Sequence, residues 1–137
     1  MTKFDTKRLP ADWDELAPDG SRVRKLMRVS SGDMAHFELP AGEVSTAEIH
    51  PDFEEMWYFV AGRGEMWRKQ GDREETVSVE PGVSISIPKN TVFQFRALGE
   101  ESLEAIGVTM PPWTGEASVE NVAGIWEPTV GKRSKSY

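Results

Sequence analysis

From Arg22 to Met110 the chain consists of short runs of alternating apolar and polar residues, separated by turn residues. Nine runs are candidate strands: residues 22–29, 33–39, 44–50, 55–61, 64–69, 75–79, 83–87, 92–96 and 103–110. Glycine, proline, asparagine and aspartate lie between them, and no convincing helix is longer than a turn or two. Short strands at this spacing are typical of a β-sandwich or β-barrel. We therefore predict an all-β fold.

The two ends of the chain differ from this pattern. Residues 1–21 are a polar arm, in which Pro10-Ala-Asp-Trp-Asp-Glu-Leu16 favours one short helical turn. Pro111 and Pro112 cannot continue a central strand, so residues 111–137 form a tail. We expect Trp126 of this tail to dock on the barrel and residues 132–135 to fray. The whole chain, 1–137, is then one domain with its barrel at residues 22–110.

Composition excludes several classes of protein. The formal charge of −7 argues against a nucleic-acid partner, and the basic run from Arg22 to Arg28 is interpreted as a solvated strand face. The absence of cysteine excludes disulfides, thiolate nucleophiles and cysteine-ligated metal centres. No run approaches the roughly 20 apolar residues of a membrane span, and the N-terminus lacks an apolar signal-peptide core. We expect a cytoplasmic protein with no membrane partner.

Polar residues gather around the stretch from Gly42 to Gly62. Residues two apart in a strand point the same way, so Glu48 and His50 share one face. Glu55 follows the Pro51-Asp52 turn and can return towards them from the next strand. Two carboxylates and an imidazole on one face predict a polar site sunk into an apolar pocket.

The spacing in this stretch resembles the first motif of the cupin superfamily. That motif is Gly, five residues, His-x-His, three or four residues, Glu, six residues and Gly. Gly42, His50, Glu55 and Gly62 match it throughout, whereas Glu48 takes the position of the first histidine.

A second stretch resembles the second cupin motif, which is Gly, five residues, Pro-x-Gly, two residues, His, three residues and Asn. Gly82 and Pro88 match it. Asn90 stands where glycine is expected and tolerates the same left-handed turn. Phe93 replaces the histidine and Ala97 the asparagine. The resemblance implies a cupin-type β-barrel, also called a double-stranded β-helix or jelly roll, of the small single-domain bacterial kind.

In metal-dependent cupins the ligand positions correspond to residues 48, 50, 55 and 93. Glu48, His50 and Glu55 could hold a hard or borderline divalent ion, but Phe93 cannot bind one. We therefore expect no cofactor, with a divalent metal at Glu48, His50 and Glu55 as the alternative. The other histidine, His36, alternates with Ala35 and Phe37, and we interpret it as an ordinary surface or edge-strand residue.

Four aromatic residues are expected to line the cavity: Trp57, Phe59, Phe93 and Phe95. Aromatic walls suit a planar or sugar-like ligand, although such rings also simply fill small barrels. Without a metal, His50 is the best general base, and Glu48 or Glu55 can orient it or act as the acid.

Three functional hypotheses follow. The first is a metal-independent enzyme that isomerises, epimerises or dehydrates a small polar metabolite, with His50 as base. Metal-independent cupins include histidine-based sugar-nucleotide epimerases and a nucleoside-aldehyde dehydratase, which are analogies of fold. The second is a divalent-metal lyase or oxygenase, and the third is a non-catalytic small-molecule-binding protein. We also expect a homodimer, since cupins often pair through edge strands.

Overall fold

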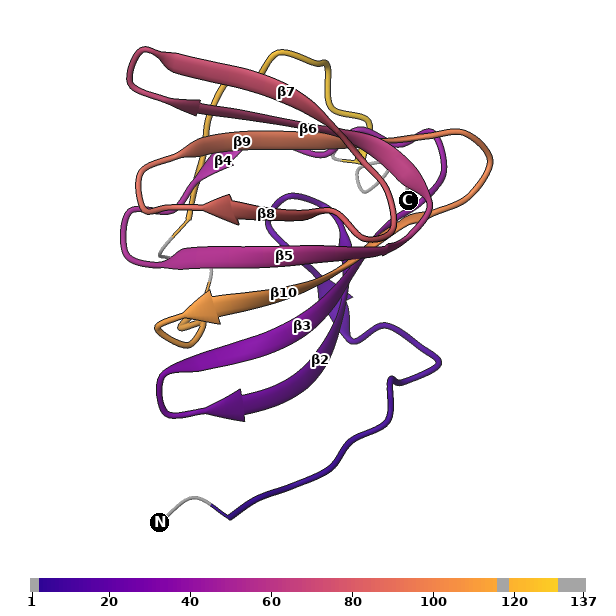
Figure 1. Cartoon of the computed structure of the whole chain (residues 1–137), viewed down its shortest axis with the longest axis vertical. Coiled ribbons are helices and arrows are strands. Elements are labelled where there is room, and N and C mark those ends of the chain that lie inside the picture. Colours follow the sequence, from indigo (N-terminus) through magenta and orange to yellow (C-terminus); the bar gives the residue numbers. More distant parts are fainter. Residues whose placement is uncertain (1–2, 116–118, 131–137) are drawn as a thin grey trace.

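The computed structural model describes residues 3–115 and 119–130 and contains two antiparallel β-sheets (Figure 1). In the first sheet the strand order is β1 (Glu15–Leu16), β2 (Arg22–Val29), β3 (Gly32–Leu39), β10 (Leu103–Met110), β5 (Glu54–Ala61) and β8 (Ser84–Ile87). In the second it is β11 (Glu120–Asn121), β4 (Glu48–Ile49), β9 (Val92–Leu98), β6 (Arg63–Gln70) and β7 (Arg73–Val79). The predicted all-β fold is confirmed.

The core lies between the two sheets because alternate residues of each strand point inwards. In β5, Glu55, Trp57 and Phe59 are buried, whereas Met56 and Tyr58 between them are exposed. The apolar cluster contains Leu39, Trp57, Phe59, Met66, Val79, Ile85, Ile87, Phe93, Phe95, Ala97, Leu103 and Ala105. Glu55 lies at the start of β5, so it reaches the interior at one end of this core.

Two turns depend on left-handed backbone. Gly62 has a φ of 73°, and a Cβ atom there would lie 2.2 Å from the carbonyl oxygen of Ser102. Asn90 has a φ of 63°, which is the conformation predicted for the residue replacing glycine in the second motif. Its backbone N–H donates to the carbonyl oxygen of His50 at 2.9 Å. The Asn90 turn therefore holds the backbone of His50.

Two local predictions were wrong. The expected strand at residues 44–50 is reduced to β4 and an isolated bridge between Val44 and Arg96. The expected helical turn near Pro10 is absent, and β1 pairs with β2 instead. An isolated helical turn is marginal, and the Asp14 carboxylate, which accepts the backbone N–H of Lys25 at 2.8 Å, helps to fix the extended arm.

The interpretation of His36 as a surface residue was also wrong. Its side chain does point away from the apolar face, but it is only 2% exposed. It lies on an interior strand in register with Arg24, whose guanidinium donates to the carbonyl oxygens of Pro10 and Ala11. The Nε2 atom lies 2.7 Å from Oε1 of Glu104. The N-terminal arm, which Arg24 holds, and the Glu104 carboxylate thus surround the His36 ring on the side of the sheet that faces away from the core.

The described part of the tail packs on the second sheet. The backbone N–H groups of Ile125 and Trp126 donate to Oε1 of the buried Gln94, and the Trp126 ring lies 4.4 Å from the Arg96 guanidinium. The docking of Trp126 agrees with the prediction. Residues 132–135, which were expected to fray, lie outside the described residues. Within the described ranges, no helix is long and apolar enough to cross a membrane.

Candidate active site

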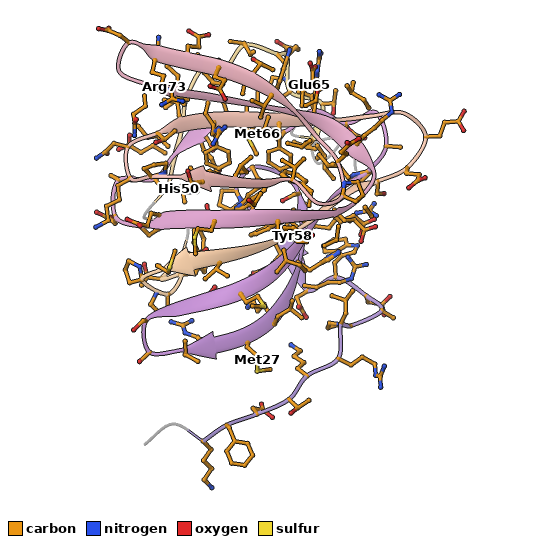
Figure 2. The ribbon with its side chains drawn as sticks, viewed as in Figure 1. Met27, His50, Tyr58, Glu65, Met66 and Arg73 are labelled. Carbon is orange, nitrogen blue, oxygen red and sulfur yellow. The ribbon has the colours of Figure 1, made fainter. Side chains whose placement is uncertain are left out.

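The two sheets bring Glu48, His50 and Glu55 together in the interior. Figure 2 labels His50 of this group. Glu48 belongs to β4 in one sheet, Glu55 belongs to β5 in the other, and His50 follows β4 directly. Glu48 pairs in register with Phe93 of β9. The positions that correspond to ligands in metal-dependent cupins are therefore adjacent here, with a phenyl ring at the fourth.

A cavity of about 230 Å³ opens beside these residues. Its polar lining includes Asp19 and Thr109 as well as Glu48, His50 and Glu55, and Trp57 forms part of its apolar wall. The cavity is therefore large enough for a small metabolite and has titratable groups along its wall.

The central imidazole lies between two carboxylates. His50 Nε2 is 2.7 Å from Glu48 Oε1, and His50 Nδ1 is 3.0 Å from Glu55 Oε2, the latter an ion-pair contact without hydrogen-bond alignment. Glu55 Oε1 also accepts the indole N–H of Trp57 and the hydroxyl of Thr109, each at 3.2 Å. Because all three charged side chains are at most 5% exposed, their positions are fixed by one another and by β5 and β10.

This arrangement retains protons at neutral pH. Desolvation alone would lower the pKa of His50, but its close contacts and charge interactions with Glu48 and Glu55 raise that pKa to about 9. Burial raises the pKa of Glu48 to about 8, against the opposing effect of its hydrogen bond to His50. The two groups titrate as a coupled pair, and both shifts favour the protonated site.

The observed donor set does not fit a metal. Both ring nitrogens of His50 face carboxylates, and the Phe93 ring lies 5.1 Å from the imidazole at the position where a fourth ligand would be needed. In the part of the chain that the structure describes, no three His, Asp or Glu side chains form a group able to hold a metal ion. We derive no chemical step through a metal.

Comparison with known proteins identifies the family. The family model for the cupin domain matches residues 35–109, which is more than half of the chain. This chain belongs to the cupin family. The predicted double-stranded β-helix is confirmed by the same match and by the solved structures that share the fold.

Several proteins resemble this cupin over most of its length. An uncharacterized protein of Methanocaldococcus jannaschii is 26% identical over 119 residues, covering 80% of this chain and 92% of that one. A solved structure of a Streptomyces PAC13 variant with uridine is 18% identical, with a TM-score of 0.69 and coverage of 96% and 98%. Pac13 is described as a nucleoside dehydratase. An uncharacterized Klebsiella pneumoniae protein with a double-stranded β-helix domain is 13% identical, with a TM-score of 0.63 and coverage of 87% and 91%.

Of the four aromatic residues that we expected to bind a ligand, Trp57 lines the cavity of this cupin. Phe59, Phe93 and Phe95 are at most 2% exposed and pack against the Trp57 ring, with ring centroids 5.1–6.1 Å from it. They do not belong to the cavity lining and instead support Trp57 from the core side.

The cavity contains functional candidates that sequence reasoning missed. Phe37 stacks on Trp57 at 4.9 Å and lines the wall with Trp113. Phe53 packs on the His50 ring at 4.2 Å. The alternation of the second candidate strand, residues 33–39, places Phe37 inwards, and this signal could have indicated it. Trp113 belongs to the segment interpreted as a tail, where strand alternation gives no information.

The mouth of the cavity carries balanced charges. Lys25 and Arg28 line it, and a bulge between them in β2 changes the alternation of the strand. Lys25 lies 3.2 Å from Glu15, and Arg28 lies 3.7 Å from Asp33. The predicted solvated basic face is thus divided. Arg24 is largely buried, where it pairs with Glu38 and bonds the N-terminal arm, whereas Lys25 and Arg28 line the cavity.

Trp57→Ala is expected to lower the free energy of unfolding by about 3–5 kcal/mol, because it leaves a large hole beneath the site. Trp57→Phe retains most of the packing and removes only the N–H donor to Glu55, so we expect a loss of about 1–2 kcal/mol. Urea unfolding followed by circular dichroism measures both. Similar losses for the two variants would show that packing is not the main contribution of Trp57.

Proposed function

We propose that this cupin catalyses acid/base proton transfer on a small hydroxylated metabolite, with dehydration as the main candidate reaction and isomerisation or epimerisation as related ones. The observation that carries the proposal is the buried chain from Glu48 through His50 to Glu55 at the cavity wall. Such a chain holds an imidazole in one orientation and provides a path for a proton. A structural role alone would not require three charged groups in the interior, because burying them is costly.

The proton balance favours His50 as an acid in its resting state. Since its pKa is raised to about 9, the ring is an imidazolium at neutral pH. Because both ring nitrogens face carboxylates, it can pass its Nδ1 proton through Glu55 to a departing hydroxyl oxygen. The C–O bond then breaks and water leaves, while the adjacent carbon loses a proton and the C=C bond forms. Glu48, bonded to Nε2, can then return a proton to the ring. This reverses the role of base that the sequence alone suggested for His50.

The aromatic wall supports a ligand with a flat or ring-shaped portion. The Phe37 ring, which lines the cavity and stacks on the buried Trp57, offers apolar contact to a sugar or base, while the carboxylates can accept hydrogen bonds from its hydroxyl groups. The likeness in fold to Pac13, a nucleoside dehydratase that was solved with uridine, is consistent with a nucleoside-like or sugar-like ligand.

The proposal is tested by incubating the purified protein in D2O with ribonucleosides, aldoses and uronic acids. We expect at least one compound to exchange a carbon-bound proton, seen by ¹H NMR, or to lose one water, seen by mass spectrometry. The His50→Ala variant should do neither. No exchange and no water loss for any compound, together with binding of one of them by calorimetry, would instead favour a non-catalytic binding protein.

A parallel measurement of metal content tests the alternative that this cupin is a divalent-metal lyase or oxygenase. Protein purified without chelators is measured for metal content, as wild type and as His50→Ala. Stoichiometric metal in the wild type that is lost in the variant, with activity that disappears on chelation, would contradict the metal-independent proposal. Unchanged activity after chelation would support it.

We retain the homodimer as a prediction, and the outer face of β5 supports it. Met56, Tyr58 and Val60 are 55%, 51% and 41% exposed in consecutive outward positions, and Figure 2 labels Tyr58 on this strand. Light scattering should give a dimer mass for the wild type and a monomer mass for Tyr58→Glu. Val29→Glu, at an exposed apolar residue at the end of β2, is the matched control and should remain dimeric.

A further inference from the structure

Asp19 is a buried carboxylate of the cavity wall that lies outside the set predicted from the sequence. It is 3% exposed and lines the same cavity as Glu48, His50 and Glu55. Its charge interacts with those of Glu55 and His50. The N-terminal arm, which the sequence indicated only as a polar segment, therefore contributes a titratable group to the site.

The two oxygens of this carboxylate have different surroundings. Oδ1 accepts both the backbone N–H of Ser21, at 2.8 Å, and the hydroxyl of Ser21, at 2.6 Å. Oδ2 accepts no hydrogen bond from the described residues, although Asp19 borders the cavity. One oxygen thus anchors the side chain, and the other keeps a lone pair for a ligand.

The backbone around Asp19 is held in place. Its carbonyl oxygen accepts the N–H of Thr46 at 2.9 Å, two residues before Glu48. The turn is closed by hydrogen bonds from Gly20 to Ala17 and from Ala17 to Ser21, at 2.9 and 2.8 Å. The carboxylate therefore has a fixed position relative to the strand that carries Glu48 and His50, as a catalytic group requires.

A purely local role does not account for the residue type. The hydrogen bonds from Ser21 close a turn around the side chain of Asp19, and an asparagine oxygen could accept both of them. A carboxylate at this place instead has to be desolvated close to Glu55, which is unfavourable. A conflict of this kind with the demands of stability is expected at functional positions.

We propose that Asp19 is the second acid/base group of this cavity and removes a proton from a substrate carbon while His50 protonates the leaving oxygen. This inference rests on the proposed function. In the step, Oδ2 takes the proton from the carbon next to a carbonyl group, and that C–H electron pair forms the new C=C bond. The C–O bond at the adjacent carbon breaks, and its oxygen takes the proton that His50 passes on through Glu55 and departs as water. Neither oxidant nor reductant is needed, and the substrate class is a β-hydroxy carbonyl compound.

The proton affinity of Asp19 suits this role. Burial raises its pKa to about 6, against the opposing hydrogen bonds from Ser21. The group is then ionised at pH 7 but more basic than an ordinary aspartate, which favours general-base catalysis near neutral pH. With His50 protonated at the same pH, the cavity contains one base and one acid at once.

The test compares wild type with Asp19→Asn, which can retain the acceptor for both Ser21 hydrogen bonds, using the compound that the wild type converts. We expect deuterium exchange at carbon and water loss to fall by about 100-fold or more. Ligand affinity should change by less than about threefold. Asp72→Asn, at an exposed carboxylate of the turn between β6 and β7 outside the cavity lining, is the matched control and should retain wild-type activity.

Asp19→Ala provides a second measurement if the amide variant fails to fold. Added formate should restore part of its activity if the lost group is a base, since a small carboxylate can occupy the vacated space. Wild-type activity in Asp19→Asn, or an Asp19→Ala variant that is folded, inactive and unresponsive to formate, would overturn the role of Asp19 and leave the proposed function intact. A wild type that converts no compound would overturn the proposed function itself.

Discussion

His50→Ala is expected to reduce turnover of a converted compound by about 100-fold or more, the range of a single acid/base group. The imidazole contacts both Glu48 and Glu55, so its removal interrupts the path of the proton. The steady-state rate in a water-loss assay measures the effect. The loss should lie in kcat, because the aromatic wall that contacts the ligand remains.

Two further variants make this result interpretable. His50→Gln preserves polar contacts with the neighbouring carboxylates and should fold if the alanine variant does not, yet it should be equally inactive. Glu48→Gln removes the carboxylate bonded to Nε2, so the pKa of His50 should fall and the basic limb of the pH–rate profile should move to lower pH. An alanine variant with more than about a third of wild-type turnover would end the proposal that His50 transfers the proton.

The free energy of unfolding is expected to decrease as the pH rises from about 5 to 9. His50 has a pKa of about 9 in the folded protein against an ordinary 6.5, so its contribution is complete below pH 6.5 and is lost through pH 9. The pKa of Glu48 rises from 4.5 to about 8 and that of Asp19 from 3.8 to about 6, which has the same sign. The folded state thus binds more protons than the unfolded state throughout this interval.

The size of this effect follows from the shifts. One pKa unit corresponds to about 1.4 kcal/mol, and because the shifts of His50 and Glu48 depend on each other they do not add, so the loss is on the order of a few kcal/mol. Urea titrations at pH 5, 7 and 9 measure it, and Glu48→Gln should flatten the dependence between pH 5 and 8. Below pH 5 an opposite trend begins, because Arg24 and Arg22, against the effect of burial, lower the pKa of Glu38. Stability that stays constant or increases from pH 5 to 9 would contradict the proton balance of the site.

Much of the fold could be predicted because strand formation follows a local pattern. The bounds of β2 and β10 are those expected from alternation, and Asn90 has the left-handed backbone that its place in the turn required. The polar set was predictable for the same reason. Glu48 and His50 are two residues apart, and Glu55 follows across a short turn. Their proximity in space therefore follows from a single short stretch of sequence.

The tertiary structure decided which other side chains share the cavity. Asp19 and Trp113 are far from His50 in sequence, and only the path of the arm and the end of β10 brings them to the same wall. Phe59, Phe93 and Phe95 alternate inwards as expected, but they lie in the apolar core and do not line the cavity. His36 is buried through contacts made by Arg24 and Glu104 from neighbouring strands.

The protonation state of the site also could not be predicted from the sequence. Residue types alone suggested that His50 is a base, because an unperturbed imidazole is largely neutral at pH 7. Its pKa depends on burial and on two carboxylates that approach from opposite sheets, and both are properties of distances between segments. The sequence by itself determined the strands, the turns and the central Glu48, His50 and Glu55. Only the tertiary packing determined which residues line the cavity, that Asp19 is one of them, and that the His50 imidazole is charged. Each of these depends on contacts between segments that are distant in the chain.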